Sequence, residues 1–89
     1  MSNILETIKQ AARERKILKI IYIEKDGSSE GWRFIEPYSF SRQDGRIDGL
    51  YAWDKNKNGI RRFILEQIQE AEIAEENFTP RFEIKINWI

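Results

Sequence analysis

The chain has 89 residues, and its 15 basic and 15 acidic side chains give a formal net charge of zero. This length predicts one domain near the small end of what folds alone. Cysteine and histidine are both absent, which excludes disulfides, thiolate metal sites, thiol nucleophiles, the commonest metal ligand and the usual neutral-pH general base. We therefore expect no enzyme, no metal and no cofactor.

Two further features concern location and partners. No apolar run approaches the roughly 20 residues of a membrane span, and Met1-Ser2-Asn3-Ile4 lacks the basic start of a signal peptide, so we expect a cytoplasmic protein. Residues 1–65 carry thirteen basic and nine acidic side chains, a net of +4, whereas residues 66–89 carry two and six, a net of −4. Such polarity is typical either of polyanion binding or of two solvated faces.

The sequence begins with a predicted helix over about residues 3–15. Asn3 followed by Glu6 has the spacing of a capping box. Apolar residues recur behind this cap at helical spacing. They are Ile4, Leu5, Ile8, Ala11 and Ala12. So thin an apolar stripe must pack on another element.

Strands follow. From Ile17 onward apolar residues occupy both faces of a predicted strand, which suggests that it is covered on both sides. A turn at Asp26-Gly27-Ser28-Ser29 leads to a second strand from about Gly31, in which Pro37 restricts pairing or marks a bend. The Asp44-Gly45 pair then predicts a hairpin.

The second half adds five short elements. Strands are predicted over 47–54, 60–64 and 70–74, with one helical turn over 65–68. A last strand is predicted over about 81–88 because apolar residues alternate strictly with polar ones. They are Phe82, Ile84, Ile86 and Trp88. The predicted fold is mainly β with one N-terminal helix (α+β): a single domain over 1–89 whose barrel, over about 17–78, is a small SH3-like or Sm-like barrel of five or six antiparallel strands.

The order and spacing of several short motifs resemble the WYL domain family. The motifs are Leu18-x-Ile20-x-Tyr22, Arg33-x-Ile35-Glu36-Pro37-Tyr38, Leu50-x-Ala52-Trp53, Arg61-Arg62-Phe63-x-Leu65-x-x-Ile68 and Phe78-x-Pro80. The resemblance runs over about residues 4–78 and implies an Sm-like or SH3-like sensor module. Such a module binds nucleic acid or a nucleotide-type ligand and regulates a DNA-binding domain or a partner protein.

The chain departs from the family pattern at two places, so the resemblance is to a divergent WYL domain, and we expect it to stand alone because the helix-turn-helix that usually precedes such domains is missing. The family's name-giving Trp-Tyr-Leu falls on Asp48-Gly49-Leu50, so only the leucine is kept. Gln67 stands where the resemblance implies a second arginine just before Ile68. An amide side chain offers neither the charge nor the bidentate fork of a guanidinium.

Arginines and aromatic residues on the predicted strands are the candidate ligand-binding residues. Guanidinium groups bind phosphate through paired hydrogen bonds, and aromatic rings stack on bases. The candidates are Arg33, Arg61, Arg62, Tyr51, Trp53 and Tyr38. Arg61 and Arg62 point to opposite faces of one strand, so at most one serves a given site. The competing interpretations are ion pairing of Arg33 with Glu36 or a nearby carboxylate, solvation of Arg62, and core packing of the aromatics.

A second hypothesis belongs to a different class. The alternating strand over 81–88 could pair with a second chain, which would make Phe82, Ile84, Ile86 and Trp88 the interface of a homodimer or of a partner-protein complex. On this hypothesis the domain is a protein-interaction module, and its arginines are structural.

Overall fold

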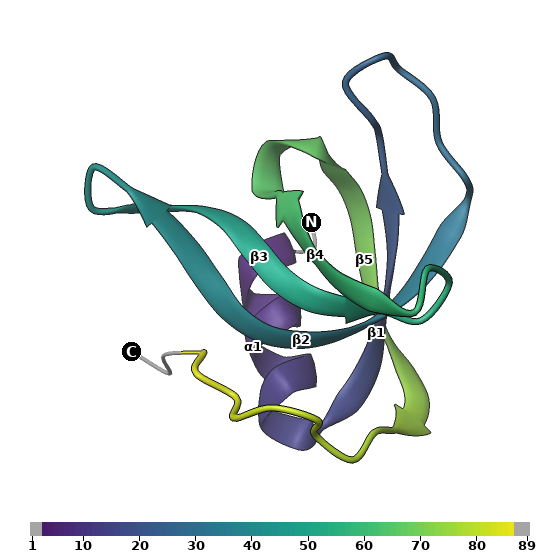
Figure 1. Cartoon of the computed structure of the whole chain (residues 1–89), viewed down its shortest axis with the longest axis vertical. Coiled ribbons are helices and arrows are strands. Elements are labelled where there is room, and N and C mark those ends of the chain that lie inside the picture. Colours follow the sequence, from purple (N-terminus) through teal and green to yellow (C-terminus); the bar gives the residue numbers. More distant parts are fainter. Residues whose placement is uncertain (1–2, 87–89) are drawn as a thin grey trace.

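A computed structural model describes residues 3–86 as one helix packed on a curved antiparallel sheet (Figure 1). The elements in chain order are α1 (Ile4–Glu14), β1 (Lys16–Tyr22), β2 (Trp32–Gln43), β3 (Arg46–Asp54), β4 (Gly59–Ile64), the 3-10 helix η1 (Leu65–Gln67) and β5 (Ile68–Asn77). The sheet has five strands in the order β4-β3-β2-β1-β5. The predicted mainly-β fold with one N-terminal helix is confirmed, as an open sheet rather than a closed barrel.

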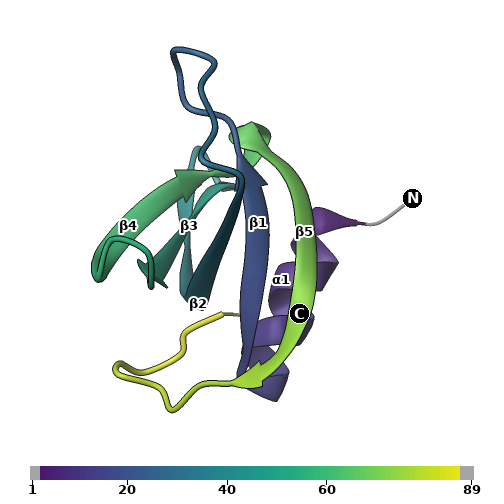
Figure 2. The same ribbon diagram turned by 90° about the vertical axis from the view of Figure 1, so that its right-hand side faces the viewer.

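Helix α1 forms where the sequence predicts it. The side chain of Asn3 caps the helix by accepting a hydrogen bond of 3.2 Å from the backbone N–H of Glu6. Arg15 ends the helix in the left-handed conformation, with φ of 54°, and its backbone N–H donates to carbonyl groups of the last helical turn. Helix α1 packs on β5, β1 and β2, and Figure 2 shows the helix from the side, next to β5.

Two apolar clusters lie on opposite faces of the sheet. The main cluster fills the space between α1 and the concave face and includes Ile8, Leu18 and Phe63. The smaller cluster lies on the outer face around Ile17, Tyr38 and Phe78. Neighbouring residues of β1 therefore enter different clusters, which confirms that this strand is covered on both sides.

Strand β2 carries the irregularity that Pro37 predicts. Pro37 faces Ala52 of β3, and the register then shifts before Ser39 faces Tyr51, which is a β-bulge. On its other edge β2 pairs with β1 only between Ile35 and Trp32. Proline thus lies where no hydrogen bond to β1 is required.

The strand predicted over about 81–88 is not formed over residues 81–86, and residues 87–89, with Trp88, lie outside the described range. Instead, residues 78–86, which we call the C-terminal segment, return across the outer face as extended chain (Figure 1). The N–H of Lys85 donates to the carbonyl of Tyr38 over 2.7 Å. One such contact does not make a ladder, because the side chains of the segment are buried separately, with Phe82 against Tyr38 and Ile86 in the main cluster. No helix within residues 3–86 is long and apolar enough to cross a membrane.

Candidate functional site

Two arginines from different strands converge on one carboxylate. Arg33 of β2 and Arg61 of β4 both point to the concave face, and both bind Glu24 in the loop that follows β1. Arg61 Nη2 lies 2.7 and 2.9 Å from the two carboxylate oxygens of Glu24, and Arg33 Nη1 lies 2.9 Å from Oε2. The ring of Phe63 lies 5.3 Å from each guanidinium carbon, which places both cations against one aromatic ring.

A second carboxylate holds Arg33 from the opposite side. Its Nη2 donates to Asp54 Oδ2 over 2.7 Å, and both side chains are fully buried. The other oxygen of Asp54 accepts the backbone N–H groups of Asn56 and Lys57 at 2.9 and 3.3 Å, which fixes the turn between β3 and β4. The buried ion pair therefore joins β2 to this turn.

Protonation states follow from these contacts. Burial alone would lower the pKa of Arg33, but hydrogen bonds to Asp54 and Glu24 raise it above its ordinary value. The hydrogen bond from Arg61 is the largest cause that lowers the pKa of Glu24, against a smaller opposing effect of burial. Both shifts favour the charged forms of Arg33 and Glu24 near neutral pH.

The burial of Arg33 corrects one sequence expectation. The strand pattern predicts that Arg33 reaches an anionic ligand directly, but in this conformation its side chain is 0% exposed and both terminal nitrogens are bound to carboxylates. Only its Nε lacks a partner among the described residues. The competing interpretation, pairing with a nearby carboxylate, describes the geometry, although the partners are Asp54 and Glu24 rather than Glu36.

Arg61 remains accessible beside Glu24. Its side chain is 32% exposed, and it borders a depression of about 500 Å³ at the end of the sheet where β1 meets η1. The depression is lined by side chains of mixed charge. They are Tyr22, Glu24, Lys25, Asp26, Arg61, Arg62, Ile64 and Gln67. Gln67 donates its amide to the carbonyl of Ile23 over 2.8 Å, so it braces the loop after β1 where the resemblance implies an arginine.

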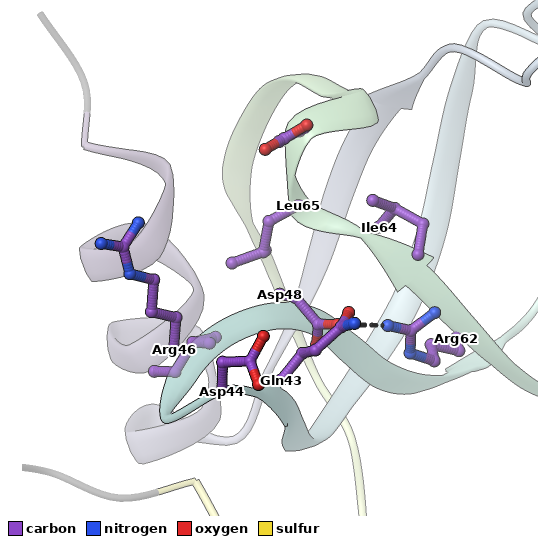
Figure 3. A pocket seen from close by; sticks show the side chains of 9 residues that line it. Gln43, Asp44, Arg46, Asp48, Arg62, Ile64 and Leu65 are labelled. Carbon is purple, nitrogen blue, oxygen red and sulfur yellow. Dashed lines mark hydrogen bonds and ion pairs between the residues drawn. The ribbon is translucent and has the colours of Figure 1, made fainter.

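Arg62 points to the face of the sheet opposite to that of Arg61, as expected for neighbouring residues of one strand. Its Nη2 binds Asp48 over 2.7 Å and its Nε donates to Ser41 over 3.0 Å, so it is both paired and partly exposed. Tyr51 lies directly across from it on β3 and is 40% exposed. A second depression of about 770 Å³ separates the β2–β3 hairpin from β4 and η1 and includes Arg62, Asp48 and Leu65 (Figure 3).

Trp53 and Tyr38 lie under the C-terminal segment. The guanidinium carbon of Arg81 lies 4.4 Å from the centroid of the Trp53 ring, and its Nε binds the buried carboxylate of Glu36 over 3.1 Å. The hydroxyl of Tyr38 donates to Glu36 over 2.7 Å and accepts the N–H of Arg81 over 2.8 Å. Burial is the largest cause that raises the pKa of Tyr38 to about 12. Tyr38 is therefore buried, and Trp53 is half-buried beneath Arg81 and Phe82.

The predicted interface residues do not share one exposed face. Phe82 is 48% exposed and its ring lies 5.3 Å from that of Tyr38, whereas Ile86 is 3% exposed in the main cluster. Ile84 packs against both clusters. The alternating side chains over 82–86 are therefore used within the domain, on either side of the chain.

Sequence reasoning misses the acidic half of the site. Glu24 and Asp54 were not among the candidates, and Arg81 was expected only as the start of a strand. A signal was present: a buried arginine on an apolar strand requires carboxylate partners, and both carboxylates lie at the ends of predicted strands. Within residues 3–86 no group of three or more acidic side chains is placed to hold a metal ion.

Comparison with known proteins identifies the fold. The model of the WYL domain family matches residues 3–73. Among solved structures, proteasome accessory factor B/C (PafBC) of Arthrobacter aurescens matches with a TM-score of 0.71 and 24% sequence identity. The match covers 81% of this chain but 11% of that one. No curated protein sequence matches the chain.

Proposed function

The chain belongs to the WYL domain family, and from this premise we propose a non-enzymatic regulatory domain that senses an anionic ligand. The ligand is a nucleic acid or a nucleotide-type molecule, and binding modulates a transcription-related partner in the cytoplasm. The family match supports the regulatory class, since a WYL domain is a sensor module by the resemblance set out above. The chain spans 11% of its structural neighbour, so the partner and the ligand are part of the proposal.

The observation that carries the proposal is the position of Arg61. Its guanidinium is held against the rings of Phe63 and Tyr22, 5.3 Å from each centroid, and yet is 32% exposed beside an open depression. A guanidinium that is fixed in place loses little conformational freedom when it binds an anion. Lys25 lines the same depression, and Arg62 borders it although its guanidinium points to the other face and binds Asp48, so both arginines adjoin one site, contrary to the expectation that at most one does.

The size of the surface favours a single strand of nucleic acid over a single phosphate group as the ligand. The depression beside Arg61 and the larger one beside the hairpin share Arg62 and Ile64, so they form one continuous surface that extends to Arg46. Tyr51, exposed and directly across from Arg62, offers a ring for stacking at its border. Base–aromatic stacking contributes about 1–3 kcal/mol per base where it occurs.

Titration with short single-stranded DNA and RNA at two salt concentrations tests the proposal. If Lys25, Arg61 and Arg62 each neutralise a phosphate, the logarithm of affinity falls with the logarithm of salt with a slope of about −2. Arg61→Ala is expected to weaken binding and to reduce this slope by roughly 0.7. Arg42→Ala removes an exposed arginine that lines neither depression and serves as the matched control. Equal losses in the two variants, or no binding at low salt, would contradict the proposal.

A further inference from the structure

We infer that Glu24 occupies the anion-binding position of this domain in the free state, and that a phosphodiester ligand binds by displacing its carboxylate. The inference rests on the proposed function and adds a mechanism to it. Glu24 presents two oxygens to guanidinium nitrogens of Arg33 and Arg61 at 2.7 to 2.9 Å. This is the geometry in which an oxyanion ligand is bound by two arginines.

The carboxylate can leave without unfolding its loop. The backbone of Glu24 is held in a turn, because its N–H donates to the carbonyl of Ser28 and its carbonyl accepts the N–H of Gly27, each over 2.8 Å. The preceding residue, Ile23, is bonded to the carbonyl of Gln67 over 2.9 Å. The side chain of Glu24 is 27% exposed and borders the depression, so rotation about its own bonds moves the carboxylate into solvent.

Displacement of the Glu24 carboxylate would expose the guanidinium nitrogens that it now occupies. Arg61 keeps its aromatic support, and Nη1 of Arg33 loses its only acceptor while Nη2 remains on Asp54. A buried guanidinium nitrogen without a partner is costly, so a ligand must supply an oxygen to Arg33 as well as to Arg61. This requirement selects a compact oxyanion over a diffuse negative surface.

The charge balance indicates which oxyanion fits. Arg33 and Arg61 carry two positive charges, and Glu24 and Asp54 carry two negative charges. With Glu24 displaced, the cluster has a net charge of +1, which a monoanion neutralises. A phosphodiester of a nucleic-acid backbone carries one negative charge, whereas a terminal phosphate monoester carries nearly two near neutral pH. We therefore expect the diester to be preferred.

Glu24→Gln tests the inference with oligothymidylate as the probe. Removal of the competing charge is expected to tighten binding about five- to tenfold, as read by fluorescence anisotropy. Glu30→Gln is the control, because it makes the same charge change on the same loop, in a carboxylate that forms an ion pair with the exposed Lys57 and acts on Arg33 only through its charge, as the last of the causes of its raised pKa. Its affinity should stay within about twofold of the parent. The gain should vanish in the Glu24→Gln, Arg61→Ala double variant, and thymidine 5′-monophosphate should compete weakly.

Nuclear magnetic resonance of the unaltered protein gives a second readout that does not depend on a variant. Saturation with oligothymidylate should shift the side-chain carboxyl carbon of Glu24 and the Nε–H of the buried Arg33, while the Glu30 carboxyl carbon stays unchanged. Equal tightening in both glutamine variants, or binding with no shift at Glu24, would overturn the inference and leave the proposed function standing. Failure of the parent and of Glu24→Gln to bind at any salt would overturn both.

Discussion

The buried pair between Arg33 and Asp54 allows a quantitative prediction for Asp54→Asn. The substitution keeps the shape of the side chain and an oxygen for the backbone N–H groups of Asn56 and Lys57, but it removes the charge that faces a fully buried guanidinium. Breaking a buried pair by removing one partner costs about 3–5 kcal/mol. Glu24 still holds Arg33 from the other side, so we expect the lower end, about 3 kcal/mol.

That loss is large for this domain. A chain of 89 residues has an unfolding free energy of about 4–13 kcal/mol. With an m-value of about 1–1.5 kcal/mol per M, a loss of about 3 kcal/mol lowers the urea midpoint by roughly 2–3 M. Asp44→Asn, the same change at an exposed turn, should alter the unfolding free energy by less than about 0.5 kcal/mol.

A double variant separates the ion pair from other effects of the substitution. Arg33→Met removes the buried cation, so Asp54→Asn should cost about 1–3 kcal/mol less in that background than in the parent chain. Urea denaturation followed by tryptophan fluorescence measures all four proteins. If Asp54→Asn costs under about 1 kcal/mol, or costs the same with and without Arg33, the pair does not hold this end of the sheet.

Three further predictions concern the outer face. The pKa of Tyr38 is raised from 10.0 to about 12, so its contribution to stability is complete below pH 10 and is lost as the pH rises through about 12. Between pH 10 and 12 the unfolding free energy of the Tyr38→Phe variant should therefore fall by about 2 kcal/mol less than that of the control variant Tyr51→Phe. Gly49→Ala should destabilise by about 1–3 kcal/mol in thermal unfolding, because the new Cβ would lie 2.6 Å from Ser41 Oγ. Arg81→Ala should lower stability by about 1–3 kcal/mol because it leaves a buried carboxylate without its ion pair, and Arg81→Lys should recover part of the lost stability. An unchanged melting temperature of the Gly49→Ala or the Arg81→Ala variant would contradict these contacts.

Local patterns are sufficient to predict most of the fold. The cap at Asn3 and the apolar stripe behind it define α1 to within a residue or two, because both are set by neighbours along the chain. Turn residues likewise define where strands end: the Asp44-Gly45 pair has φ of 52° and 78° and connects β2 to β3. The bend at Pro37 follows from the missing N–H of proline.

The C-terminal segment shows where such patterns stop being sufficient. Alternation over 82–86 predicts that the apolar side chains share one face, and this holds only while the chain runs straight along a sheet. Here Phe82 packs on Tyr38 outside the sheet, and Ile86 enters the main cluster beside α1. The edge of β2 is free of β1 beyond Ile35, so what replaces a ladder is the separate burial of these side chains, which is a property of the assembled fold rather than of local sequence.

Gly49 shows a similar limit at the position where the family resemblance implies a tyrosine. The space that a side chain would fill is occupied by Ser41 Oγ, and the Nε of Arg62 lies 3.2 Å from the same point. These two side chains bind one another and Asp48, so a polar network replaces an aromatic ring there. The substitution is understandable only once the three residues, distant in sequence, are placed together by β2, β3 and β4.

Arg33 connects parts of the molecule that no sequence pattern links. Through Asp54 it binds the turn between β3 and β4, and through Glu24 it binds the loop after β1 and, indirectly, Arg61 of β4. The guanidinium of Arg33 binds both carboxylates, so any change in how Glu24 is held alters the electrostatic balance at Asp54 as well. The proposed sensing function gives this burial cost a reason beyond stability, because a ligand position must be coupled to the backbone around it for binding to be transmitted.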